Sequence, residues 1–153
     1  MLYLASDHAG FELKEVLKKY LLEIGFDVKD MGNFVYDEND DYPEWIFLAA
    51  HAVAEDLKNG VDSKAIVFGG SGQGEAMVAN RVPGIRTAVL YNYNEDIIKL
   101  SREHNDANIL SLGARFISEE DAKKAVKAWI ETEFSREERH ERRISKIESR
   151  ITK

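Results

Sequence analysis

Cysteine is absent from the 153-residue sequence, and proline occurs only twice. Without a thiol, the chain forms no disulfide, offers no cysteine ligand to a metal and has no thiol nucleophile. No apolar stretch approaches the ~20 residues of a membrane-spanning helix. The first ten residues lack the basic segment and long apolar run of a secretory signal. These absences lead us to expect a protein of the reducing cytoplasm that does not associate with membranes.

Positive charge is also in deficit. The 21 Lys and Arg face 28 Asp and Glu, which leaves a net charge of −7, and so acidic a chain is a poor general binder of nucleic acid. Residues 136–153 are the exception, with seven Lys and Arg against four Glu. This basic segment is either a solvated helix or a surface for an anionic ligand or a partner subunit, and its composition leaves these alternatives open.

The chain does have short apolar runs, and they alternate with segments of helical spacing. The runs at 2–5, 26–30, 64–68, 86–91 and 108–112 predict strands. Helices are expected over 13–24, 43–59, 75–81, 94–103 and 118–134, with a last charged helix from about 136 to the end. Ser118 and Asp121 resemble an N-terminal capping box. The alternation predicts one α/β domain over residues 1–153, with a five-stranded, mainly parallel sheet and helices on both faces.

Glycine is concentrated in "AIVFGGSGQGEAMVANR", residues 65–81, where Gly69, Gly70, Gly72 and Gly74 fall within six positions. The loop follows a predicted strand and opens a helix, a setting that suits anionic or electron-rich ligands. It is neither a dinucleotide fingerprint nor a P-loop. A sharp turn would explain one or two glycines, so four favour a loop that faces a ligand.

Glu75 stands at the exit of the glycine loop. It is either an ordinary acid in the first turn of a helix or a general base. A carboxylate can abstract a proton next to a carbonyl while backbone N–H groups stabilise the enediolate oxygen.

Polar residues follow the predicted strands at the carboxyl edge of the sheet, where such sheets bind ligands. Asp7 and His8 end the first strand and are either structural or catalytic. His104 and Asn105 precede the last strand, so a second subunit would most easily bring them to the same site. His51 is expected on a helix surface. No pair of histidines or acidic cluster suggests a metal, and we expect none.

Three arginines, Arg115, Arg139 and Arg143, suit a phosphate, which guanidinium groups bind in bidentate fashion. Together with the glycine loop, they suggest a phosphorylated sugar or polyol as the ligand. In the last helix the apolar positions are Ile144, Ile147 and Ile151. So narrow a stripe favours packing on another helix or subunit, with a surface helix on its own domain as the alternative.

The sequence resembles the ribose-5-phosphate isomerase type B family, whose relatives act on galactose and allose 6-phosphates. The resemblance covers nearly the whole chain and rests on five segments in order: "SDHAG" (6–10), "DYP" (41–43), "GGSGQGEAMVANRVPGIR" (69–86), "SREHNDANILSLGAR" (101–115) and "RHERR" (139–143). It implies a Rossmann-like αβα fold and a homodimer with active sites between subunits. It also implies aldose–ketose isomerisation through an enediol, without metal or organic cofactor.

The resemblance also implies roles for individual residues. Glu75 is the base, and His104 assists ring opening with Asp7. Ser71 belongs with these catalytic residues, in the loop that stabilises the enediolate. The remaining residues bind the substrate: His8, Tyr42, Gly70, Gly72, Gly74, Asn105, Arg115, Arg139 and Arg143.

Three departures from the family pattern leave alternatives open. Gly69 occupies the position where one branch of the family has a cysteine base, and Glu75 matches the other branch. Glu137 and Glu138 replace two glycines before Arg139, and the loop before Tyr42 is longer and more acidic than usual. The departures leave the preferred sugar open, so a hexose 6-phosphate isomerase stays as an alternative. A non-catalytic sugar-phosphate sensor and a tetramer built from dimers are further alternatives that the sequence leaves open.

Overall fold

Eleven elements make up the protein in a computed structural model, which describes residues 1–151 except for the side chain of Ile151. The strands are β1 (Leu2–Ser6), β2 (Val28–Asp30), β3 (Lys64–Gly69), β4 (Thr87–Leu90) and β5 (Ile109–Gly113). The helices are α1 (Phe11–Glu23), α2 (Tyr42–Lys58), α3 (Gln73–Ala79), α4 (Glu95–Glu103), α5 (Glu119–Glu131) and α6 (Glu138–Ile151).

The five strands form one sheet in the order β2-β1-β3-β5-β4, and every pairing is parallel. The predicted parallel sheet is therefore confirmed. The three central strands are buried except for Lys64, the first residue of β3. Edge strands β2 and β4 are only three and four residues long. Short edge strands offer little unpaired backbone to other chains.

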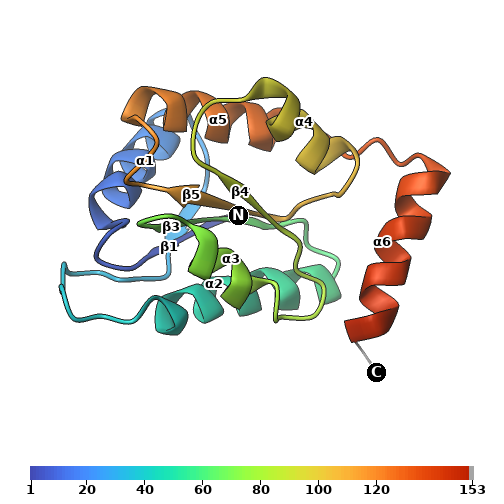
Figure 1. Ribbon diagram of the computed structural model, residues 1–153, viewed down its shortest axis with the longest axis horizontal. Helices are drawn as coiled ribbons and strands as arrows, with labels where there is room; N and C mark the ends of the chain where they lie inside the picture. Colours follow the sequence, from blue (N-terminus) through green and yellow to red (C-terminus); the bar gives the residue numbers. More distant parts are fainter. Residues whose placement is uncertain (152–153) are drawn as a thin grey trace.

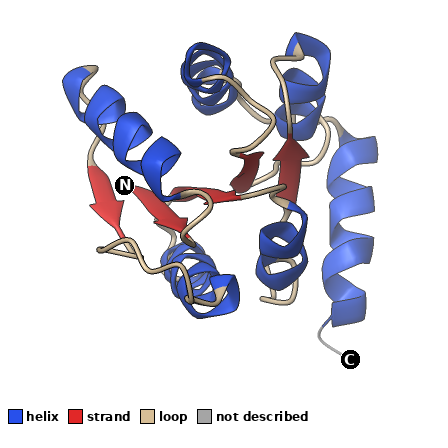
Figure 2. Cartoon of the chain, turned by 60° about the vertical axis from the view of Figure 1, so that its left-hand side comes forward, coloured by secondary structure: helices blue, strands red, loops and turns tan. Residues whose placement is uncertain are grey.

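Helices cover both faces of the sheet and give the three layers seen in Figure 1 and Figure 2. Side chains of the central strands alternate between two cores because successive residues point to opposite faces. Ile66 and Phe68 pack with α1, α4 and α5, whereas Ala65 and Val67 pack with α2 and α3. A continuous apolar run in the sequence thus supplies both cores at once.

Most expected elements lie within two residues of their predicted bounds, and Ser118 caps α5 by accepting a hydrogen bond from the Asp121 N–H at 3.2 Å. The helix expected over 118–134 ends instead at Glu131. Arg102 donates from Nε to the carbonyl of Thr132 at 3.1 Å. This contact anchors an extended segment, and α6 then begins at Glu138 rather than near Arg136.

Helix α6 stands at the end of the domain, apart from the sheet (Figure 1). Glu148 accepts a hydrogen bond from Arg86 Nη1 at 2.9 Å, and His140 stacks on His104. Most other α6 side chains are exposed, and Ile147 is 47% exposed. The side chain of Ile151 and residues 152–153 lie outside the described residues. No helix in the described part of the chain is long and apolar enough to cross a membrane.

Candidate active site

A cavity of about 370 Å³ opens at the carboxyl edge of the sheet, where the loops after β1, β3 and β5 meet. These strands are neighbours in the sheet, so residues far apart in the sequence converge there. The lining residues are Asp7, His8, Ala9, Tyr42, Gly70, Ser71, Gly74, Glu75 and Arg115. The structure therefore brings together eight of the predicted site residues at the expected edge.

The glycine loop is held against the end of β5. Gly72 has φ +75°, a backbone conformation that favours glycine, and its carbonyl accepts a hydrogen bond from Ser111 Oγ at 2.7 Å. Arg115 donates its backbone N–H to the carbonyl of Gly70 at 3.1 Å. Gly72 thus shapes the turn without lining the cavity, and these two hydrogen bonds tie the loop to β5 and the segment after it.

Glu75 lies in the first turn of α3 and is 4% exposed. Its carboxylate folds back over Gly69. The approach is so close that a Cβ added at position 69 would collide with the carboxylate oxygens. Burial raises the pKa of Glu75 above its ordinary range, and the nearby charge of Asp7 raises it further. A buried carboxylate with few partners binds a proton more readily than an exposed one, which suits a general base.

Asp7 is a second buried carboxylate in the same cavity. Its Oδ1 accepts the backbone N–H of Gly10 at 3.0 Å, just before α1 begins. Burial raises the pKa of Asp7 as well, although the hydrogen bond from Gly10 opposes the shift. Asp7 therefore has the structural role that the sequence suggested and also lines the cavity.

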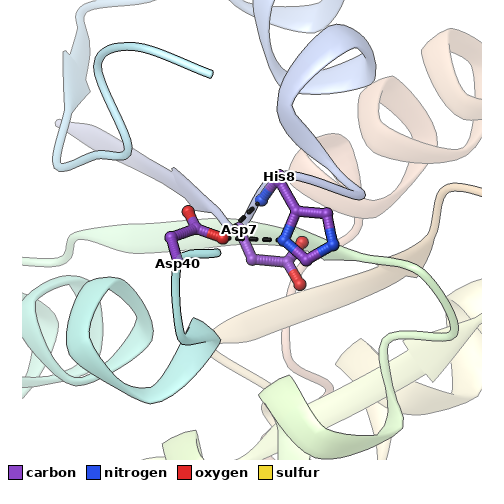
Figure 3. Close-up of side chains that lie close together, drawn as sticks. All are labelled: Asp7, His8 and Asp40. Carbon is purple, nitrogen blue, oxygen red and sulfur yellow. Dashed lines mark hydrogen bonds and ion pairs between the residues drawn. The ribbon is translucent and has the colours of Figure 1, made fainter. Parts of the chain in front are cut away.

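His8 makes its strongest contacts with Asp40, a residue that the sequence analysis did not identify. One oxygen of Asp40 accepts both the backbone N–H of His8 at 2.9 Å and a hydrogen bond from His8 Nδ1 at 2.8 Å. Figure 3 shows both interactions. Asp40 lies in the acidic loop before Tyr42, and the sequence offers no sign that this loop returns to the end of β1.

Asp7, His8 and Asp40 also lie close enough to offer one atom each to a cation, with those atoms within 4.8 Å of one another. However, Asp40 already accepts two hydrogen bonds from His8, and its other oxygen accepts from Asn33 Nδ2 and Trp45 Nε1. The carboxylate is therefore committed to neighbouring donors, and the expectation of a metal-free site stays a prediction.

The other predicted residues lie away from this cavity. His104 ends α4 and Asn105 follows it, before β5 begins. The five residues of β5 span roughly 16 Å, so these two lie at the opposite end of the sheet. Arg139 and Arg143 are exposed on α6, and Arg139 pairs with Glu137 at 2.9 Å.

Fold and site together define a three-layer α/β protein with an acidic, glycine-lined cavity at the carboxyl edge of a parallel sheet. Comparison with known families gives the more specific assignment. Residues 2–147 match the model of the Ribose/Galactose Isomerase family, and the chain belongs to this family. The resemblance seen in the sequence is thereby confirmed.

Relatives and solved structures agree with the family. The chain is 42% identical to ribose-5-phosphate isomerase B of Mycolicibacterium paratuberculosis over 142 residues, covering 93% of this chain and 86% of that protein. A crystal structure of ribose-5-phosphate isomerase B from Mycoplasma genitalium with bound ribulose-5-phosphate superposes with a TM-score of 0.90 at 36% identity, covering 99% and 96% of the two chains. The structure of ribose-5-phosphate isomerase B from Clostridium thermocellum gives a TM-score of 0.89 at 38% identity, covering 99% of this chain and 97% of that chain.

Proposed function

We propose that this protein is an aldose–ketose isomerase that interconverts ribose 5-phosphate and ribulose 5-phosphate through an enediol. The observation that carries the proposal is the buried carboxylate of Glu75 beside the glycine loop, in a cavity also lined by His8 and Arg115. The relatives named as ribose-5-phosphate isomerase B support the choice of substrate. The reaction moves protons only, so we expect it to need no metal or organic cofactor.

Glu75 is the general base in this proposal. Its carboxylate removes the C2 proton of the open-chain aldose and later delivers a proton to C1, while the oxygen on C1 gains a proton and that on C2 loses one. Backbone N–H groups between Gly70 and Gly74 hold the enediolate oxygens, each donor being worth roughly 3–4 kcal/mol in comparable sites. Ser71 lies in this loop, and its exposed side chain is available to the sugar.

Arg115 and His8 bind the phosphate at one end of the cavity, and Tyr42 borders the sugar. Binding energy from the phosphate orients the reacting carbons against Glu75. Asp7 assists ring opening by exchanging protons with the sugar oxygens, a role that suits a carboxyl group whose pKa burial raises.

A second subunit completes the site in this proposal. His104, Asn105, Arg139 and Arg143 lie at the other end of the domain, and three of them are exposed. A homodimer in which the two ends face each other gives each cavity a ring-opening histidine and two further phosphate ligands from the partner. The basic C-terminal segment, residues 136–153, is then a dimer contact as well as a source of ligands.

The first experiment follows conversion of ribose 5-phosphate to the ketose by wild type and by Glu75→Gln, with allose 6-phosphate run alongside. We expect ribose 5-phosphate to be converted and Glu75→Gln to lose at least about a hundredfold in kcat. Activity on allose 6-phosphate alone would replace the proposal with a hexose phosphate isomerase. Binding of ribose 5-phosphate without exchange of its C2 proton in D₂O would identify a sensor instead.

The shared site is tested by mixing two inactive variants, Glu75→Gln and His104→Asn, under conditions that allow subunits to exchange. If His104 acts on the partner's cavity, each mixed dimer contains one intact site and one with both defects. Random exchange then restores about a quarter of wild-type activity. If His104 served its own subunit, every site would keep one defect and the mixture would stay inactive.

A further inference from the structure

Asp40 lies in the loop from Met31 to Asp41, and neighbouring residues hold its carboxylate in place from several sides. Only 5% of the Asp40 side chain is exposed. Its Oδ2 accepts from Asn33 Nδ2 at 2.7 Å and from Trp45 Nε1 at 3.1 Å. Asn33 is itself buried, and its Oδ1 accepts a hydrogen bond from Ser6 Oγ at 3.2 Å. One oxygen of Asp40 is thus fixed by the fold, which leaves Oδ1 aimed at the end of β1.

The other carboxylate oxygen of Asp40, Oδ1, makes two contacts with His8. Asp40 Oδ1 receives the backbone N–H of His8 at 2.9 Å and lies 2.8 Å from His8 Nδ1 (Figure 3). A carboxylate accepts and does not donate, so the proton between the two groups resides on Nδ1. Asp40 therefore holds both the backbone and the ring of His8. Nε2 is the ring nitrogen left to interact with a ligand in the cavity that His8 lines.

We infer that Asp40 is a positioning residue, which orients the His8 ring and keeps its Nε2–H directed at the substrate phosphate. This inference rests on the proposed isomerase function, and it adds to the reaction a residue that does not itself line the cavity. Asp40 acts through His8 in the way that a carboxylate fixes the tautomer and orientation of a histidine in other sites.

The charges around His8 are consistent with a phosphate-binding imidazolium. Asp7 and Asp40 stabilise the cation, and Arg115 opposes it. The Tyr36 ring forms a T-shaped pair with the His8 ring, with 6.4 Å between centroids. The hydrogen bond with Asp40 is the largest influence and raises the pKa of His8 above its ordinary value. A charged donor binds phosphate more strongly than a neutral one.

The test uses Asp40→Asn in the full-length protein, with Glu38→Gln as the matched control. Glu38 is exposed on the same loop and carries the same charge. Asp40→Asn should raise KM for ribose 5-phosphate about tenfold, the difference between a charge-assisted and a neutral hydrogen bond, and leave kcat within about twofold. The KM effect should be larger above neutral pH than below it, because His8 loses the partner that keeps it protonated. Glu38→Gln should match wild type.

Nitrogen-15 NMR of the four histidines in the ligand-free protein reports the tautomer and the titration of His8. A loss of stability alone would change neither. In wild type, His8 should carry its proton on Nδ1 and titrate above the ordinary histidine range of about 6.5. In Asp40→Asn that pKa should fall. An unchanged His8 titration, or a variant that loses kcat while KM stays constant, would overturn the inference.

This measurement needs no turnover, so the two proposals fail separately. A wild type that shows the predicted His8 titration but leaves ribose 5-phosphate unconverted would refute the proposed function. A fully active Asp40→Asn variant with wild-type KM would refute only the role of Asp40.

Discussion

The imidazole rings of His104 and His140 stack on each other, with centroids 4.1 Å apart and planes inclined by 18°. His140 belongs to α6 and is 2% exposed, and its Nε2 has no hydrogen-bond partner among the described residues. Burial lowers the pKa of His140, and the neighbouring His104, Arg139 and Arg143 lower it further while Glu137 opposes them. Burial therefore favours the neutral form of the His140 ring in this contact.

Acidification should loosen α6 through this histidine. Because the folded protein binds fewer protons at His140 than the unfolded chain, the stabilisation is lost as pH falls below the ordinary histidine pKa of about 6.5. We expect the amide hydrogens of α6 to be less protected from exchange at about pH 5.5 than at about pH 7.5, after correction for the intrinsic exchange rate and relative to the sheet. His140→Phe keeps a flat ring without a titrating group and should reduce this difference. An equal loss of protection in both proteins would exclude His140 as the cause.

Glu75 should reduce stability at neutral pH. Its raised pKa means that the folded state binds more protons than the unfolded chain, so stability falls as pH rises above the ordinary value of 4.5. Glu75→Gln should therefore melt at a higher temperature than wild type at neutral pH, and the gain should vanish near about pH 4. Thermal melts of both proteins across this range measure the difference. A variant less stable than wild type at neutral pH would contradict the raised pKa.

Gly69→Ala should displace the Glu75 carboxylate, because the new Cβ would occupy its place. Under the proposed function, we expect kcat to fall on the order of a hundredfold because the proposed base is misplaced. Stability should fall by about 1–3 kcal/mol through overpacking. The same substitution made in a Glu75→Ala background should cost much less stability, since the colliding group is gone. Denaturant titrations of wild type, the two single variants and the double variant give the free energies of unfolding for a double-mutant cycle. If Gly69→Ala destabilised both backgrounds equally, the contact would be refuted.

Glu137 competes with phosphate for Arg139 under the proposed function. The two side chains pair at 2.9 Å while both remain about half exposed, at 53% and 52%. An ion pair this exposed is worth about 0–1 kcal/mol, so Glu137→Gln should lower KM for ribose 5-phosphate by a few-fold at most. Glu138→Gln removes the same charge from the next exposed position and serves as the control. Identical KM values for the two variants would assign any effect to net charge.

The sheet and the glycine-loop end of the site follow from local patterns. Continuous apolar runs such as Ala65–Phe68 are typical of central parallel strands, and parallel strands place their following loops at one edge. Asp7, Glu75 and Arg115 were therefore expected to converge there, and they do. The packing of the Glu75 carboxylate against Gly69 was not predicted, because the sequence shows only that Glu75 follows the glycine loop.

Asp40 and the end of α5 could not be predicted in the same way. Asp40 is one of several acids in a polar loop, and only the fold brings it to His8, 32 positions away. Likewise, α5 ends at Glu131, and Arg102 from another helix donates to the carbonyl of Thr132 just beyond that end. Both features depend on contacts between distant segments, which no local periodicity records.

The cavity is assembled from the loops after β1, β3 and β5, so its residues span most of the chain. Parallel pairings between such distant segments form slowly, because the intervening loops must close before the contacts stabilise them. We therefore expect the complete site to form late in folding. During refolding, isomerase activity should return after the helical signal, and the delay should lengthen on dilution if a second chain supplies His104.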